Sequence, residues 1–236
     1  MKVKVVIQCA GRKVVIQRAG RKDRSPGSLR TSDGRRVYFV AHPGEAGERE
    51  GQFCARPDDL SEDGRTWRER LLSYNASPGA NRLELLPAYR LYRNDVYRSL
   101  EGEERLDLFI LSAGWGLIPA TFLTPDYNIT FSKNPKISPA FRRHRSDVFH
   151  DWSMIDGGSS EPLVFLGGKD YLPHFVRLTD QYQGPRIVVF NSITKPSHEG
   201  LTFVRYKTST RTNWHYKAAK ALLDGTLRLP GIHGGL

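Results

Sequence analysis

The feature that most constrains the fold is an almost continuous apolar run, LDLFILS, at residues 106–112. Such a run is typical of a strand in the middle of a largely parallel sheet, where both faces are covered. Runs rich in β-branched and aromatic residues predict further strands at residues 1–7, 37–41, 129–131, 162–166, 186–190 and 203–206. Apolar spacings of three and four predict helices at residues 61–74, 83–100, 139–155, 169–179 and 212–223.

Strands that alternate with helices predict an α/β fold. We expect one compact domain over residues 1–236, with a central mixed, largely parallel sheet flanked by helices. Residues 5–13 (VVIQCAGRK) are nearly repeated at residues 14–22 (VVIQRAGRK). One copy is expected to form the first strand, and the pattern leaves open which one.

The charge favours a polyanionic partner. Thirty-six Lys and Arg against 25 Asp and Glu give a net charge of +11, which attracts nucleic acid through counterion release and steering; the alternative is a basic protein that is merely soluble. No apolar run is long enough for a membrane helix or a secretory signal, so a cytoplasmic location and no membrane contact are expected.

The motifs that mark several other function classes are missing from the sequence. The two cysteines, Cys9 and Cys54, form no CxxC and no zinc-ligand spacing with histidine. The sequence also has no P-loop, no GxSxG and no GxGxxG. We therefore expect a protein that needs no metal and no cofactor.

Ligands of open α/β sheets bind beyond the carboxyl ends of the strands. Three loops in such positions are residues 8–13, 112–116 and 191–194. Amide side chains there suit the Watson–Crick edge of a base because they carry a donor and an acceptor; the alternative is that each amide caps its own loop. The candidate substrate-binding residues are Gln8 (or its duplicate Gln17), Cys9, Ser112, Gly114, Trp115, Gly116 and Asn191.

Two features near the second loop suit chemistry on a base. Trp115, between two glycines, is expected to stack on an unpaired base, or else to be a core residue. Asp126, Tyr127 and Asn128 place a carboxylate, a phenol and an amide together. The carboxylate would activate water or stabilise a sugar cation, and the alternative is an ordinary Asp/Asn turn.

Basic residues interleaved with aromatic ones suit a phosphate backbone and splayed bases. They gather in residues 133–145 and 205–220, and the alternative is a set of solvated helix faces. The candidate DNA-binding residues are Lys13, Arg142, Arg143, Arg145, Arg205, Lys207, Arg211 and Trp214.

The segments LSAGWGLIP at 111–119, DYNITF at 126–131 and RNDVY at 93–97 together resemble the YaaA-like superfamily. The resemblance implies a compact α/β fold and DNA binding, in a family linked to oxidative DNA damage. Related prokaryotic proteins are antiviral DNA glycosylases that remove modified bases such as glucosylated hydroxymethylcytosine from phage DNA. The sequence departs from the family pattern at Asp126, where the family has proline, and at Asn128, where it has Asp or Arg.

The expected function is a DNA glycosylase that hydrolyses the N-glycosidic bond of a modified base, as a monomer. Trp115 or Tyr127 would stack on the base, Gln8 and Asn191 would read it, and Asp126 with Asn128 would position water. The alternatives are a non-catalytic DNA-binding stress protein and a nucleoside hydrolase or deoxyribosyltransferase. The identity of the base, the strandedness of the DNA and lyase action stay open.

Overall fold

The computed structural model describes residues 2–11, 27–144, 146–210 and 212–232. Its main feature is a seven-stranded sheet in the order β12-β11-β10-β1-β5-β6-β9. Neighbours from β12 to β5 pair in parallel, β6 is antiparallel to β5, and β9 is parallel to β6. The strands are β1 (Val3–Gln8), β5 (Leu106–Ser112), β6 (Gly116–Pro119), β9 (Trp152–Ser153), β10 (Leu163–Leu166), β11 (Arg186–Phe190) and β12 (Leu201–Arg205).

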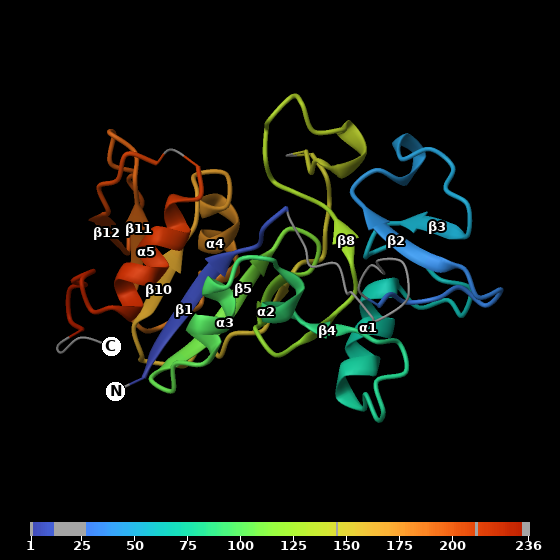
Figure 1. Ribbon diagram of the computed structural model, residues 1–236, viewed down its shortest axis with the longest axis horizontal. Helices are drawn as coiled ribbons and strands as arrows, with labels where there is room; N and C mark the ends of the chain where they lie inside the picture. Colours follow the sequence, from blue (N-terminus) through green and yellow to red (C-terminus); the bar gives the residue numbers. More distant parts are fainter. Residues whose placement is uncertain (1, 12–26, 145, 211, 233–236) are drawn as a thin grey trace.

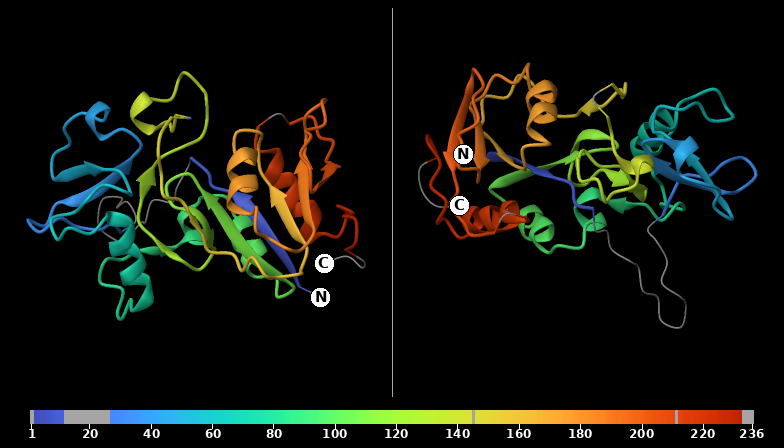
Figure 2. Two further views of the ribbon diagram at one scale, coloured as in Figure 1. Left: turned by 180° about the vertical axis from the view of Figure 1, so that it is seen from behind. Right: turned by 90° about the horizontal axis from the view of Figure 1, so that it is seen from above.

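The central strands are apolar because helices cover both faces of the sheet. Every side chain of β10 is buried, and Val5, Val6 and Ile7 of β1 are fully buried. α3 (Val96–Glu101) and α5 (Trp214–Leu223) pack on one face and on each other, and α4 (Leu172–Leu178) lies on the opposite face (Figure 2). The predicted mixed, largely parallel α/β architecture is confirmed.

A second lobe lies at the end of the molecule opposite β12 (Figure 1). It contains a three-stranded parallel sheet of β3 (Gln52–Ala55), β2 (Arg36–Val40) and β8 (Tyr127–Asn128). The rest of this region comprises α1 (Trp67–Ala76), α2 (Ala88–Leu91), the pair β4 (Leu86–Pro87) and β7 (Leu123–Thr124), and the 3-10 helices η1 (Pro43–Glu45) and η2 (Pro139–Phe141). Core residues of both sheets form one continuous hydrophobic cluster, so the lobes belong to one compact domain.

Two predicted helices are wrong. Residues 83–100 form β4, α2 and α3 instead of one helix, because Tyr92 is extended and the Asn94 side chain accepts a hydrogen bond from the Val96 backbone N–H. Residues 139–144 and 146–155, the described part of the other predicted helix, contain only η2 and β9. There the backbone bonds outward to neighbouring segments: the Arg143 N–H bonds to the Thr130 carbonyl and the Trp152 N–H to the Trp115 carbonyl.

The other predicted elements are found with shifted ends. The strand expected at residues 129–131 is β8 at residues 127–128, followed by a bridge at Thr130. The strand β1 begins at Val3 and runs into the first copy of the N-terminal repeat, and the second copy lies outside the described residues. In the part of the chain that the structure describes, no helix has both the length and the apolar character needed to cross a membrane.

Candidate functional site

A cavity of about 1100 Å³ lies at the carboxyl ends of the parallel strands. In the large sheet, β5 lies on one side of β1, and the later strands β10, β11 and β12 lie in succession on the other side of β1. Ligands of open α/β sheets bind where the direction of winding changes in this way. The cavity wall comes from the ends of β1, β10, β11 and β12, from the start of α5, and from Ser132.

Gln8, the last residue of β1, lines this cavity with an amide of fixed orientation. Its Oε1 accepts a hydrogen bond of 2.6 Å from the backbone N–H of Gly168. That bond uses the oxygen, so the amide NH₂ is the group that Gln8 offers to a ligand. The loop after β10 must come close to make this bond: a Cβ at Gly168 would lie 3.3 Å from Gln8 Oε1.

Asn191, just after β11, lines the cavity with the opposite polarity. Its Nδ2 donates a hydrogen bond of 3.0 Å to the carbonyl of Thr210, which joins the loops that follow β11 and β12. Its Oδ1 is therefore the acceptor that a ligand can use. Only β10 separates β1 from β11, so the two amides start from strands roughly 10 Å apart.

The cavity is also rich in positive charge. Lys169, Arg205 and Lys207 line it, and all three are exposed to solvent. The first turn of α5 lines it as well, and the free N–H groups of a helix start favour an anion. Asp170 is the one carboxylate among the described lining residues. The arrangement suits a ligand with a phosphate group and a polar ring.

His215, in the first turn of α5, also lines the cavity. Its side chain is 4% exposed, and its Nε2 has no hydrogen-bond partner among the described residues. Burial lowers the pKa of the imidazole to about 4. The ring is therefore neutral at pH 7, and the positive charge of the site comes from the lysines and the arginine.

Tyr171 connects the cavity wall to the core. It lines the cavity, and its hydroxyl lies 3.3 Å from Cys9 Sγ, which accepts a 3.4 Å hydrogen bond from the Ala113 N–H. Burial raises the pKa of Tyr171 well above its usual value, so the phenol stays protonated. Cys9 is thus buried behind the cavity and supports it without lining it.

The loop at residues 112–116 belongs to the core and does not line the cavity. Trp115 is fully buried, with its ring 5.0 Å from that of Phe39 and 6.0 Å from that of Trp152. The expected stacking of Trp115 on a base is therefore wrong, because no part of the ring is accessible. Ser112 is likewise fully buried and donates a 2.8 Å hydrogen bond to the Tyr127 hydroxyl.

The two glycines of this loop serve packing. A Cβ at Gly114 would lie 3.2 Å from the Tyr127 ring, and one at Gly116 would lie 2.3 Å from the Trp152 carbonyl oxygen. Gly116 also has a φ of +92°, which favours glycine. The small residues therefore let the chain pack closely instead of making room for a ligand.

The predicted catalytic segment also lies outside the cavity lining. Tyr127 is buried, and its hydroxyl is 2.7 Å from that of Tyr92. Asn128, in β8, donates a 3.3 Å hydrogen bond to the Tyr38 hydroxyl, and the Asp126 N–H bonds to the Gly27 carbonyl. Gln8 and Asn191 line the cavity, and Asp126 and Asn128 do not. The structure therefore does not support the prediction that Asp126 and Asn128 act on a base held by Gln8 and Asn191.

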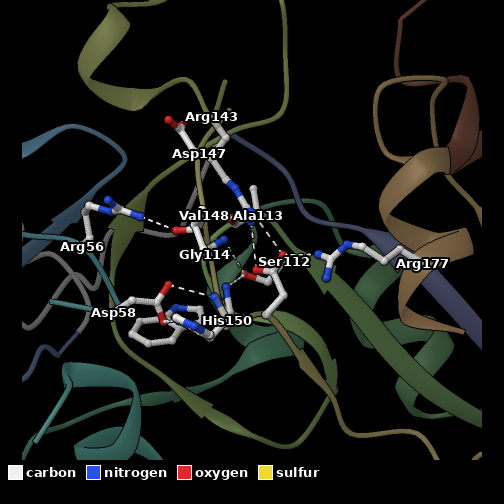
Figure 3. A network of polar contacts seen from close by, with 12 residues as sticks. Arg56, Asp58, Ser112, Ala113, Gly114, Arg143, Asp147, Val148, His150 and Arg177 are labelled. Carbon is white, nitrogen blue, oxygen red and sulfur yellow. Dashed lines mark hydrogen bonds and ion pairs between the residues drawn. The ribbon is translucent and has the colours of Figure 1, made fainter. Parts of the chain in front are cut away.

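Arg143, a predicted phosphate contact, is buried in an ion pair. Its side chain is 5% exposed and makes two hydrogen bonds, of 2.8 and 3.0 Å, to Asp151, which is 0% exposed. It also donates a 2.9 Å bond to the Ala113 carbonyl (Figure 3). Arg177 contacts Asp151 at 2.6 Å. These contacts leave Arg143 no role at DNA phosphates.

The remaining predicted DNA-binding residues lie in different places. Arg205, Lys207 and the mostly buried Trp214 do line the cavity. Arg142 is half-buried and is not among the lining residues, and its Nε atom has no hydrogen-bond partner in the part of the chain that the structure describes. Three predicted DNA-binding residues lie outside the described part of the chain: Lys13, Arg145 and Arg211.

The sequence reasoning missed Ser132, Lys169, Asp170 and His215. The strand-end rule could have found two of them, because Gly167–Asp170 directly follows the predicted strand at 162–166. Within the described residues, no three side chains of His, Cys, Asp or Glu are grouped so that they could hold a metal ion. A scan against protein-family models and searches of curated proteins and of solved structures found no match to this chain.

Proposed function

We propose that the protein is a DNA glycosylase whose active site is the cavity at the carboxyl ends of β1, β10 and β11. One observation carries the proposal: this cavity combines a fixed amide donor, a fixed amide acceptor, three cations and a carboxylate. A nucleotide presents the matching groups, because a base edge carries donors and acceptors and the phosphates are anionic.

The size of the cavity suits an enlarged base. Its volume of about 1100 Å³ lies at the top of the range, roughly 300–1000 Å³, that is usual for small-ligand pockets. The resemblance to YaaA-like proteins points to modified bases such as glucosylated hydroxymethylcytosine. We infer that the Gln8 NH₂ and the Asn191 Oδ1 read the base, while Lys169, Arg205 and Lys207 hold the phosphates.

Asp170 takes the chemical role that was expected of Asp126. The C1′–N bond breaks, and its electron pair leaves with the base, which takes up a proton from solvent. The oxygen of a water molecule bonds to C1′, and Asp170 accepts the proton that the water releases. The negative charge of Asp170 also stabilises the cationic sugar as the base departs.

The test is the formation of abasic sites in oligonucleotides that carry glucosylated hydroxymethylcytosine, hydroxymethylcytosine or cytosine. Alkali converts each abasic site into a strand break that a gel resolves. Asp170→Asn should reduce cleavage by about 100-fold or more and leave DNA affinity unchanged. Asp126→Asn, the matched control, should cleave like the wild type. Cleavage that depends on Asp126 and not on Asp170 would overturn the assignment of the carboxylate.

The same assay separates the alternative functions. A non-catalytic DNA-binding protein would bind these oligonucleotides in a salt-dependent way and form no abasic site with any of them. A nucleoside hydrolase would release the base from free nucleosides, and alanine at Arg205 and Lys207 would not slow it. Either result would refute the glycosylase proposal.

A further inference from the structure

The loop of residues 191–200, which joins β11 to β12, carries an unusual apolar residue at the edge of the cavity. Ile193 is 91% exposed, the most exposed of the large hydrophobic side chains noted among the described residues. It is also one of the residues that line the cavity. An isolated exposed apolar residue is ordinary on a protein surface, but this one lies at the mouth of the cavity that we propose binds a nucleotide.

The loop holds Ile193 in place. Ser192 Oγ donates a 2.5 Å hydrogen bond to the Thr194 carbonyl, which closes the chain around Ile193. Asn191 on the preceding side is tied to Thr210. The side chain is thus presented outward between two local anchors, and Lys195 follows in the same exposed segment.

We infer that Ile193 is a wedge that enters the base stack of duplex DNA where the target nucleotide has left it. This inference rests on the proposed glycosylase function. A nucleotide that enters the cavity must leave the duplex, which costs a few kcal/mol of lost pairing and stacking. Apolar side chains that insert between base steps offset such a loss in other DNA-binding proteins.

The position of Ile193 meets the requirements of a wedge. It must lie beside the pocket, because the gap in the duplex is next to the extruded nucleotide. It must also be surrounded by cations that hold the flanking phosphates, and Lys195, Arg205 and Lys207 are the cations of this edge. These cations favour duplex DNA over a protein partner as the occupant of this surface.

The experiment compares Ile193→Ala with Leu60→Ala, a control at a residue that is 69% exposed and does not line the cavity. Each variant is tested on a duplex and on a single strand of the same sequence with the modified base. A 2-aminopurine next to the target reports unstacking by its fluorescence. Ile193→Ala should slow duplex cleavage by about tenfold or more and reduce the fluorescence rise, and it should slow single-strand cleavage much less.

Three results would overturn the inference. These are unchanged duplex cleavage and fluorescence in Ile193→Ala, equal losses on duplex and single strand, and the same loss in Leu60→Ala. The failure of the proposed function looks different, since the wild type would then cleave no DNA. In that case the 2-aminopurine signal of the bound duplex still decides whether Ile193 unstacks the neighbouring base.

Discussion

At the scale of single residues, His215 shows how burial fixes a protonation state beside the cavity. The imidazole is 4% exposed, and burial lowers its pKa from 6.5 to about 4. The folded protein therefore binds this proton less readily than the unfolded chain does. Stability contributed by the neutral ring is present above pH 6.5 and is lost as the pH falls toward 4.

We expect His215→Phe to make the protein less sensitive to acid. When the pH falls from 8 to 5, the free energy of unfolding of the wild type should decrease by about 2 kcal/mol, because His215 binds a proton more readily in the unfolded chain. The phenylalanine variant avoids that loss and leaves no unpaired ring nitrogen. Urea unfolding at pH 8 and pH 5 measures the difference. His198→Phe, at an exposed position, is the control, and the same pH dependence in wild type and His215→Phe would contradict the assignment.

The residues show what the sequence could reveal about the site. Gln8 and Asn191 could be predicted because a residue at the end of a strong strand needs only the sheet to place it. Trp115 could not, because a Gly-Trp-Gly segment suits an accessible ring and a buried turn equally well. Phe39 and Trp152, which are distant in sequence, enclose it. The sequence predicts Asp126 as the carboxylate because it stands beside other polar groups, whereas Asp170, which the prediction missed, lines the cavity.

At the scale of elements, the segment from Thr130 to Trp152 shows why local periodicity failed. Its spacing of apolar residues predicts a helix at 139–155, yet its backbone bonds to other segments. The Arg143 guanidinium holds this segment in place, because it bonds to Asp151 in the same segment and to the Ala113 carbonyl just after β5. A pattern within a short window cannot reveal partners that are 30 residues away.

We expect Arg143→Leu to destabilise the fold by about 3 kcal/mol or more, because it leaves the fully buried Asp151 with Arg177 alone. The double variant Arg143→Leu/Asp151→Leu should recover part of that loss, since no buried charge then lacks its partner. Urea unfolding of the four proteins in this cycle gives the coupling free energy. A cost below about 1 kcal/mol for Arg143→Leu would place the pair among weak surface ion pairs.

At the scale of the whole molecule, the 36 Lys and Arg residues overstate the number of cations that are available to an anionic ligand. Arg68 and Arg143 are buried against Asp58 and Asp151. The cations that surround the cavity are few, but they share one edge of the sheet with the start of α5. The composition favours a polyanionic partner, but only the fold selects which basic residues line the cavity.

We therefore expect the salt dependence of DNA binding to depend on position more than on net charge. Replacing Arg205 and Lys207 by alanine removes two phosphate contacts and should lower the slope of log K against log salt by roughly 1.8. Lys217→Ala/Lys220→Ala is the matched control, because these exposed residues of α5 carry the same charge and do not line the cavity. Fluorescence anisotropy of a labelled oligonucleotide between about 50 and 200 mM salt measures both slopes. If the two double variants lower the slope equally, the charge acts over the whole surface and the cavity is not the DNA interface. If only the first does, the cations that hold the phosphates are those beside Gln8, Asn191 and Asp170.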